Sequence, residues 1–137
     1  AKNPHTSRHI AEFWMVEPEM AFCDLEGNMD LAEEIIKYLT SYIMVECVED
    51  LELFAKFVDK SLMPTLENVA SSVFKRLPYT EAVEILQKSG KKFEYEISFG
   101  KDLQTEHERY LTEHHFKKPL IIFDYPKKSS STNLYCS

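Results

Sequence analysis

Apolar residues recur along the middle of the chain with the spacing of helices that bury one face. Between residues 29 and 47 they fall every three or four positions, and Asn28 stands before them as a candidate N-cap. The same spacing predicts a second helix over 50–58 and a third over 64–69, which opens at a proline. Together these segments predict a helical layer.

Two later helices carry end signals as well as a spacing. Thr80 is a candidate N-cap for a helix that Gly90 ends, with acidic residues in its first turn and a lysine in its last. Over 105–116, Thr105 and Glu108 have the spacing of a capping box. We therefore expect both segments to be helical.

Three segments have the composition of strands. Residues 10–22 are mostly aromatic and β-branched, which favours a largely buried strand with Pro18 at an edge or bulge. Residues 93–99 alternate apolar and polar types, as a half-buried strand does, and 119–126 form a short apolar run closed by proline. The tail, 128–137, has no periodicity and is expected to be disordered. Helices and strands together predict an α+β fold.

Composition limits the classes of function. The 137 residues are 44% hydrophobic and 28% charged, which fits one globular domain. A net charge of -7 argues against a broad nucleic-acid surface and leaves only a local basic site open. Cys23, Cys47 and Cys136 lack a CxxC spacing, which favours reduced thiols and a cytoplasmic address, with an organelle as the alternative. No apolar run approaches the ~20 residues that cross a bilayer, so we expect no membrane association.

Several common chemistries find no support in the residues. His107, His114 and His115 lie among glutamates, but Leu111 occupies the place that a zinc HExxH helix needs for its second histidine. We therefore expect a solvated, charged helix face and no metal site. Three glycines in the whole chain cannot form a GxGxxG or P-loop motif, and no spacing marks a covalent nucleophile.

The opening stretch has the residue types of a nucleotide site. Arg8 can bind phosphate oxygens through its fork of donors, His9 can add a hydrogen bond, and Phe13 offers a flat face to a base. On a strand, Phe13 and Glu17 would project to one face. The alternative, favoured by spacing alone, is that Arg8 pairs with Glu12 and that Phe13 is core.

A family resemblance changes that balance. The stretch "TSRHIAEFWMVEPEMAF" resembles the second half of motif 2 of class II aminoacyl-tRNA synthetases, specifically the asparaginyl-tRNA synthetases of bacterial and organellar type. The likeness continues through "NMDLAEEIIKYL", "LENVASSVFKRLPYTEAVEILQKSGKKFE", "DLQTEHERYLTEHHFKKP" and "DYPK", over about nine tenths of the chain. It implies that 1–127 are part of a class II catalytic domain, an antiparallel sheet flanked by helices, and that 128–137 diverge.

The resemblance also implies roles for individual residues. Arg8, the expected catalytic residue, and His9 match positions that contact the ATP phosphates. Ile10 continues that loop, and Phe13 matches the ring on which adenine stacks. Glu17 matches the position that contacts the side chain of the amino acid. A carboxylate there can accept from the amide of asparagine, whereas it would repel the carboxylate of aspartate.

The matched region covers only some of the family's motifs. Motif 1 with the dimer interface, the start of motif 2, and motif 3 with the Mg²⁺ ligands are absent from it. Whether the chain is an enzyme by itself is therefore open, and three hypotheses follow. In the first, the chain is a segment of an asparagine-tRNA ligase that uses ATP with Mg²⁺, asparagine and tRNA(Asn) in a homodimer. In the second, it is a non-catalytic relative that acts as a binding or regulatory module. In the third, it is an aspartate-amidating enzyme on the same fold.

Overall fold

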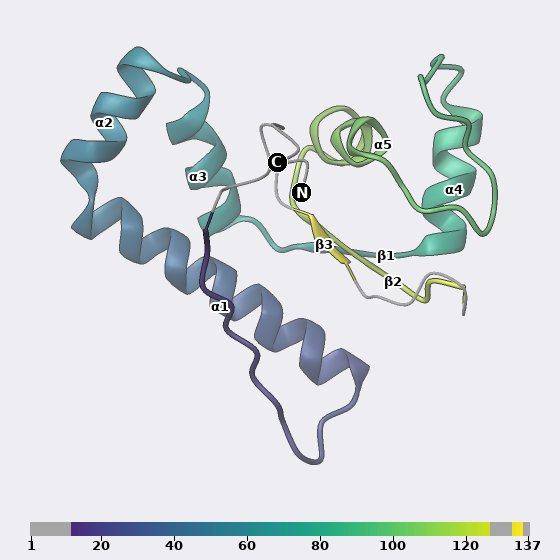
Figure 1. Cartoon of the computed structure of the whole chain (residues 1–137), viewed down its shortest axis with the longest axis horizontal. Coiled ribbons are helices and arrows are strands. Elements are labelled where there is room, and N and C mark those ends of the chain that lie inside the picture. The colour runs from purple at the N-terminus through teal and green to yellow at the C-terminus, as the bar shows by residue number, and fades with distance from the viewer. Residues whose placement is uncertain (1–11, 127–132, 136–137) are drawn as a thin grey trace.

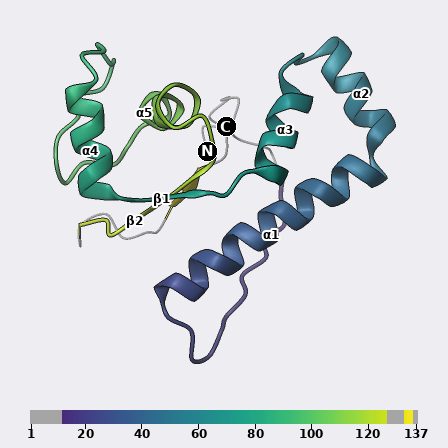
Figure 2. The ribbon, with the colours of Figure 1, turned by 180° about the vertical axis from the view of Figure 1, so that it is seen from behind.

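The helices of the chain lie in two groups on either side of a small sheet (Figure 1). The computed structural model describes residues 12–126 and 133–135. A view from behind shows the first three helices on one side and the later helices with the sheet on the other (Figure 2). In chain order the elements are α1 (Leu25–Glu46), α2 (Val48–Phe57), α3 (Leu62–Ser71), β1 (Lys75–Pro78), α4 (Tyr79–Lys88), α5 (Thr105–Arg109), the π-helix η1 (Tyr110–His115), β2 (Leu120–Phe123) and β3 (Asn133–Tyr135).

The three predicted helices of the first group are confirmed, but the expected cap of the first one is wrong. Asp24, not Asn28, is the N-cap of α1, because its Oδ1 accepts a hydrogen bond of 2.8 Å from the backbone N–H of Gly27. The helix therefore starts one turn earlier than the apolar spacing predicts. Helices α2 and α3 each begin two residues before their predicted starts.

The end signals of the later helices are partly confirmed. Helix α4 ends before Gly90, whose φ of +67° is the left-handed conformation expected of a terminating glycine. Its start differs, because Tyr79 is already helical and Pro78 is the N-cap in place of Thr80. The capping box of α5 is also displaced by one position, to Gln104 and His107.

The sheet is mixed, with the order β1-β2-β3. Strands β2 and β3 pair antiparallel, as expected, but β1 and β2 pair parallel, from Lys75 opposite Leu120 to Pro78 opposite Phe123. The expectation of an antiparallel sheet is corrected for this pair. Between β1 and β2 the chain passes through α4, α5 and η1, the kind of crossover that parallel neighbours require.

Of the predicted strands after residue 90, one is present and one is not. The apolar run over 119–126 contains β2 and is confirmed. The alternating residues 93–99 form no strand, because the backbone N–H groups of Glu94 and Tyr95 donate to the carboxylate of Glu106, at 3.0 and 2.7 Å, in place of a neighbouring strand. The tail differs from its expectation of disorder at 133–135, whose backbone forms β3.

Strand β2 contributes to two separate cores because its side chains alternate between the faces of the sheet. Leu120 and Ile122 belong to the core beneath α4 and η1, whereas Ile121 packs with Met29 and Val69 of the first helical group. No helix within 12–126 is long and apolar enough to cross a bilayer. Buried residues of the first core are Leu77, Tyr79, Ala82, Val83, Leu86, Leu103, Leu111, Leu120 and Ile122.

Candidate functional site

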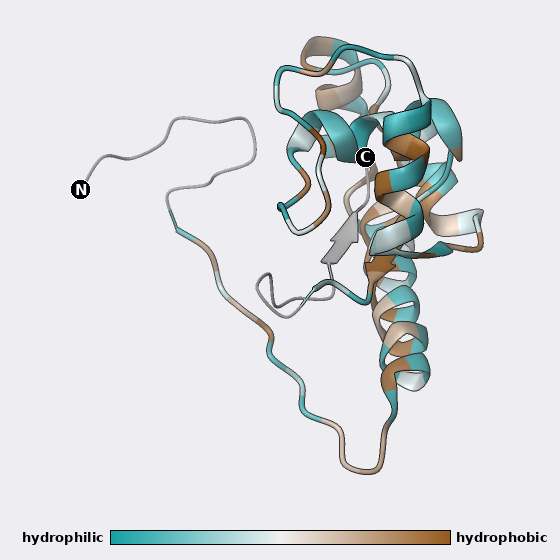
Figure 3. Cartoon of the chain, turned by 90° about the vertical axis from the view of Figure 1, so that its right-hand side faces the viewer, coloured by the Kyte–Doolittle hydropathy of each residue, from teal (hydrophilic) through white to brown (hydrophobic). Residues whose placement is uncertain are grey.

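The expected nucleotide and amino-acid site falls on the first part of the chain, of which only a portion is described. Arg8, His9 and Ile10 lie outside the described residues. Residues 12–22, which carry Phe13 and Glu17, form neither helix nor strand. Figure 3 shows this segment standing apart from the helices over most of its length.

The prediction of a largely buried strand over 10–22 is wrong for the described residues. The side chains of Phe13, Trp14 and Val16 are 63%, 94% and 88% exposed, so neighbouring positions on both faces are uncovered. A strand exists only when another strand satisfies its backbone groups. Within the described chain no strand pairs with 12–22, and this is the physical reason for the difference.

Glu17 and Phe13 are both exposed in the described part of the chain. Glu17 is exposed and forms no hydrogen bond or ion pair with another described residue. Phe13 likewise packs against no other described ring. Their shared face and their roles stay predictions, because neither rests on a contact within the described chain.

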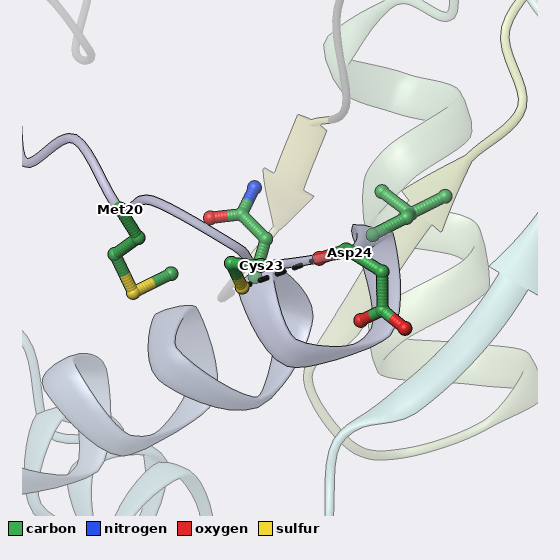
Figure 4. Close-up of a pocket in the computed structure, with 5 residues that line it drawn as sticks. Met20, Cys23 and Asp24 are labelled. Carbon is green, nitrogen blue, oxygen red and sulfur yellow. Dashed lines mark hydrogen bonds between the residues drawn. The ribbon is translucent and has the colours of Figure 1, made fainter.

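A turn joins this segment to α1, and a hollow lies beside that turn (Figure 4). Phe22 has a left-handed φ of 57°, and the exposed thiol of Cys23 donates to the backbone carbonyl of Asp24 at 3.4 Å. A Cβ on Gly27 would lie 2.9 Å from the Cys23 sulfur, so a larger residue there would displace the exposed Cys23 side chain. The Asp24 carboxylate caps α1.

A charged cluster fixes α1, which follows the end of the segment, to the sheet. Glu33 accepts a hydrogen bond of 3.0 Å from the backbone N–H of Phe74, just before β1. It also forms an ion pair with Lys37, with 2.7 Å between the charged atoms. Arg76 of β1 forms an ion pair with Asp30 and lies 3.9 Å from Glu33. Glu33 is therefore half-buried, although its place in the helical pattern suggests solvent.

The cluster changes the acidity of Glu33. Burial raises the pKa of the Glu33 carboxyl. The hydrogen bonds from Lys37 and from the Phe74 N–H outweigh burial, and together with the charges of Lys37 and Arg76 they lower that pKa below its ordinary value. Glu33 thus stays ionised in the folded chain at neutral pH.

Two aromatic residues lie at the carboxyl ends of the parallel strands. Tyr79 follows β1 and Tyr125 follows β2, and their ring centroids are 4.8 Å apart. The buried Tyr79 hydroxyl donates to the carbonyl of Lys101 at 2.6 Å and accepts from the N–H of Gly100 at 3.0 Å. Because β1 and β2 are parallel, the residues that follow them lie side by side. Antiparallel strands would not bring these two rings together, so the sequence pattern did not predict the contact.

The histidines of the predicted helix have different environments. His114 and His115 are exposed, as expected of a solvated face, but His107 is only 1% exposed. The backbone N–H of Gln104 donates to Nδ1 of His107 at 3.0 Å, so the proton of the neutral ring lies on Nε2, which donates to the carbonyl of Tyr95 at 3.0 Å. Glu106 binds the same loop, and the N–H of Tyr95 is the largest cause of the lowered pKa of its carboxyl.

These bonds give His107 a structural role that the sequence pattern concealed. The available signal was its third position in α5, from which a side chain can reach back to the cap. In the described part of the chain, no group of three or more His, Cys, Asp and Glu side chains is placed to hold a metal ion.

Comparison with known proteins gives a consistent result. The family model described as tRNA synthetases class II (D, K and N) matches residues 1–135. An asparagine-tRNA ligase of Clostridium beijerinckii is 63% identical over 127 residues, 93% of this chain. One of Oleidesulfovibrio alaskensis is 61% identical over 128 residues. The chain spans 27% and 28% of the lengths of these two relatives.

A solved structure agrees with the sequence comparisons. The crystal structure of asparaginyl-tRNA synthetase from Pyrococcus horikoshii complexed with asparaginyl-adenylate matches 78% of this chain with a TM-score of 0.60 and 33% identity. The match covers 22% of that structure's chain.

Proposed function

The chain belongs to the class II tRNA synthetases of the aspartate, lysine and asparagine group, and from this we propose that it forms part of the catalytic domain of an asparagine-tRNA ligase. The observation that carries the proposal is the 63% identity to an asparagine-tRNA ligase over 93% of the chain. Because the chain spans about a quarter of such relatives, the activity is proposed for a polypeptide that also holds their remaining parts.

In this proposal the opening segment binds the two small substrates. Arg8 and His9 contact the phosphates of ATP, Ile10 continues that loop, and the ring of Phe13 stacks on adenine. Arg8 is the catalytic residue, because its permanent charge offsets the negative charge of the ATP phosphates during the attack. Support comes from the described portion, in which the side chain of Phe13 is open to solvent and available to a base.

Glu17 selects the amino acid. An ionised carboxylate has acceptors only, so it matches the NH₂ of an asparagine side chain and repels the carboxylate of aspartate. Its exposure and its lack of partners among the described residues leave both oxygens available. Discrimination by an unpaired polar group of this kind is large, because the wrong substrate leaves it without a partner.

The reaction proceeds in two steps, activation of asparagine and its transfer to tRNA. A carboxylate oxygen of asparagine attacks the α-phosphate of ATP and expels pyrophosphate, which gives asparaginyl-adenylate. A hydroxyl of the 3' end of tRNA(Asn) then attacks the acyl carbon and releases AMP. Positioning and charge stabilisation supply the rate. ATP enters as its Mg²⁺ complex, and we assign the ligands of that ion to the parts of the complete ligase that this chain does not span.

The proposed ligase acts as a homodimer, as the resemblance implies, and in the cytoplasm. The three cysteines without a CxxC spacing support this compartment, because they suit a reducing environment. Asparagine, ATP and tRNA(Asn) are its proposed partners.

The experiment that tests the role of Glu17 uses a hybrid enzyme, in which this chain replaces the matching 27% of the Clostridium beijerinckii ligase. ATP-pyrophosphate exchange is measured with asparagine and with aspartate. Loss of a hydrogen bond to a charged group predicts that Glu17→Gln lowers the asparagine preference roughly tenfold to a hundredfold. Glu19→Gln, which removes a nearby carboxylate from the same segment, serves as the control and leaves that preference unchanged.

Unchanged discrimination in the Glu17→Gln hybrid would show that the assigned role is wrong. Product analysis in the same experiment separates the two enzymatic hypotheses. Asparagine formed from aspartate, ATP and ammonia, without asparagine-dependent exchange, would replace the ligase proposal by aspartate amidation.

A further inference from the structure

A hollow whose lining includes two lysines lies where α3 meets the end of η1, away from the opening segment. Ser61, Thr65 and Asn68 line it from the side of α3, and Lys117 and Lys118 line it from the turn that leads into β2. The hollow joins the first helical group to the group beside the sheet. Nothing in the proposed binding of ATP or asparagine uses it.

Two lysines give the hollow a positive charge. Neither Lys117 nor Lys118 forms an ion pair with another described residue. The one acid among the lining residues, Glu113, already lies 3.6 Å from Arg109, one turn earlier on the helix. Both ammonium groups are therefore available to an anion from outside the chain.

The backbone beneath the lysines is held in place. The side-chain amide of Asn68 donates to the carbonyl of Lys117 at 3.3 Å, and the hydroxyl of Ser72 donates in turn to Asn68 at 2.6 Å. Lys117 has a left-handed φ of 54°, an uncommon conformation for lysine that these bonds support. The chain thus holds the backbone of Lys117 in place at the edge of a hollow that Thr65 also lines.

We propose that this hollow binds backbone phosphates of RNA and so contacts the tRNA substrate. The inference rests on the proposed function, because it names a second contact for the tRNA of that reaction. Lysines with hydroxyl and amide groups are the usual donors to phosphate oxygens, and such contacts position a nucleic acid without reading its sequence. The hollow is open, whereas small-molecule sites enclose most of their ligand, so a polymer suits it better. Because the whole chain is acidic, we expect the contact with RNA to be confined to this place.

The test compares aminoacylation of a tRNA(Asn) transcript by the hybrid enzyme and its variants. The double variant Lys117→Gln, Lys118→Gln is expected to raise the KM for tRNA about fivefold to tenfold at low salt, and to reduce the salt slope of binding by about one to two. The charge-reversed pair, Lys117→Glu and Lys118→Glu, is expected to have a larger effect. Lys88→Gln, at an exposed lysine of α4 that pairs with Glu84, is the matched control and leaves the KM unchanged.

Two readouts separate failure of this inference from failure of the proposed function. If the parent hybrid lacks asparagine-dependent pyrophosphate exchange, the proposed function fails and the tRNA contact fails with it. If exchange is present and both double variants keep the parent KM for tRNA and its salt slope, the contact alone is overturned. A raised KM for ATP in the exchange reaction would also overturn it, because the hollow would then serve ATP and not RNA.

Discussion

The carboxylate of Glu33 accepts a hydrogen bond from the backbone N–H of Phe74, with 3.0 Å between Oε1 and N, and so ties the middle of α1 to the residue before β1. Phe74 is 3% exposed, and water cannot replace this partner without opening the core. The bond joins residues 41 positions apart in sequence. It is one of the contacts that fix the first helical group against the sheet.

Removing this acceptor is expected to destabilise the chain. Glu33→Ala leaves the buried N–H of Phe74 unpaired and should lower the free energy of unfolding by about 1–3 kcal/mol. Glu33→Gln keeps an acceptor but loses its charge partners, so its effect is expected to be smaller. Urea unfolding followed by circular dichroism measures both. Glu34→Gln, one residue later and exposed, should differ little from the parent, and an equal loss in that control would refute the explanation.

Stability is also expected to depend on pH through Glu33 and Glu106. Both carboxyls have a folded pKa below the ordinary value of 4.5. Their contribution is therefore fully present above about pH 4.5, the unfolded value, and is lost as the pH falls through the folded pKa. Urea midpoints measured between neutral pH and pH 3 should fall, and Glu33→Gln should flatten part of that fall. A parallel fall in the variant would mean that Glu33 takes no part.

His107 is expected to be structural. His107→Ala removes a buried ring that accepts from Gln104, donates to Tyr95 and packs on Phe93 with 5.0 Å between ring centroids. The loss should be about 2–4 kcal/mol, since a cavity and two unpaired backbone groups remain. His115→Ala, at an exposed position, is the control. Equal unfolding free energies for the two variants would contradict this role.

Periodicity predicted the helices well because it is a local property. Met29 and Val69 of these stretches pack in one core, although Ile35, Leu39 and Ile43 of the same apolar stripe are exposed. Gly90 ends α4 by its own backbone preference. Caps were less predictable, since Asp24 and Gln104 compete with equally suitable neighbours. A cap is decided by which side chain reaches a free N–H, and this differs between positions one residue apart.

Strands were harder to predict because they depend on distant partners. The residues of 93–99 have a strand's alternation, but Glu106 and His107 bind their backbone from a helix. Parallel pairing of β1 with β2 follows from a crossover that no local pattern reveals. The family resemblance is confirmed by the match over residues 1–135, whereas the roles of Phe13 and Glu17 remain predictions.

The isolated chain is expected to self-associate. Large apolar side chains cover much of α1 and α2 and extend into the opening segment, beyond what a monomeric protein usually exposes. Sedimentation at micromolar concentration should reveal species larger than 16.0 kDa, and Leu53→Lys with Phe57→Lys should increase the monomer fraction. A monodisperse monomer at that concentration would contradict this. The most exposed of these residues are Trp14, Met15, Val16, Phe22, Tyr38, Val45, Phe57 and Val58.

The most direct test of the central claim is asparagine-dependent ATP-pyrophosphate exchange by the hybrid enzyme that carries this chain. We predict exchange with asparagine, little with aspartate, and its loss when Arg8 is replaced by alanine. A Lys88→Gln hybrid should retain the parent rate. A folded hybrid of the parent's size that exchanges no pyrophosphate with asparagine would contradict the account, because the chain would then resemble a ligase without supporting its first chemical step.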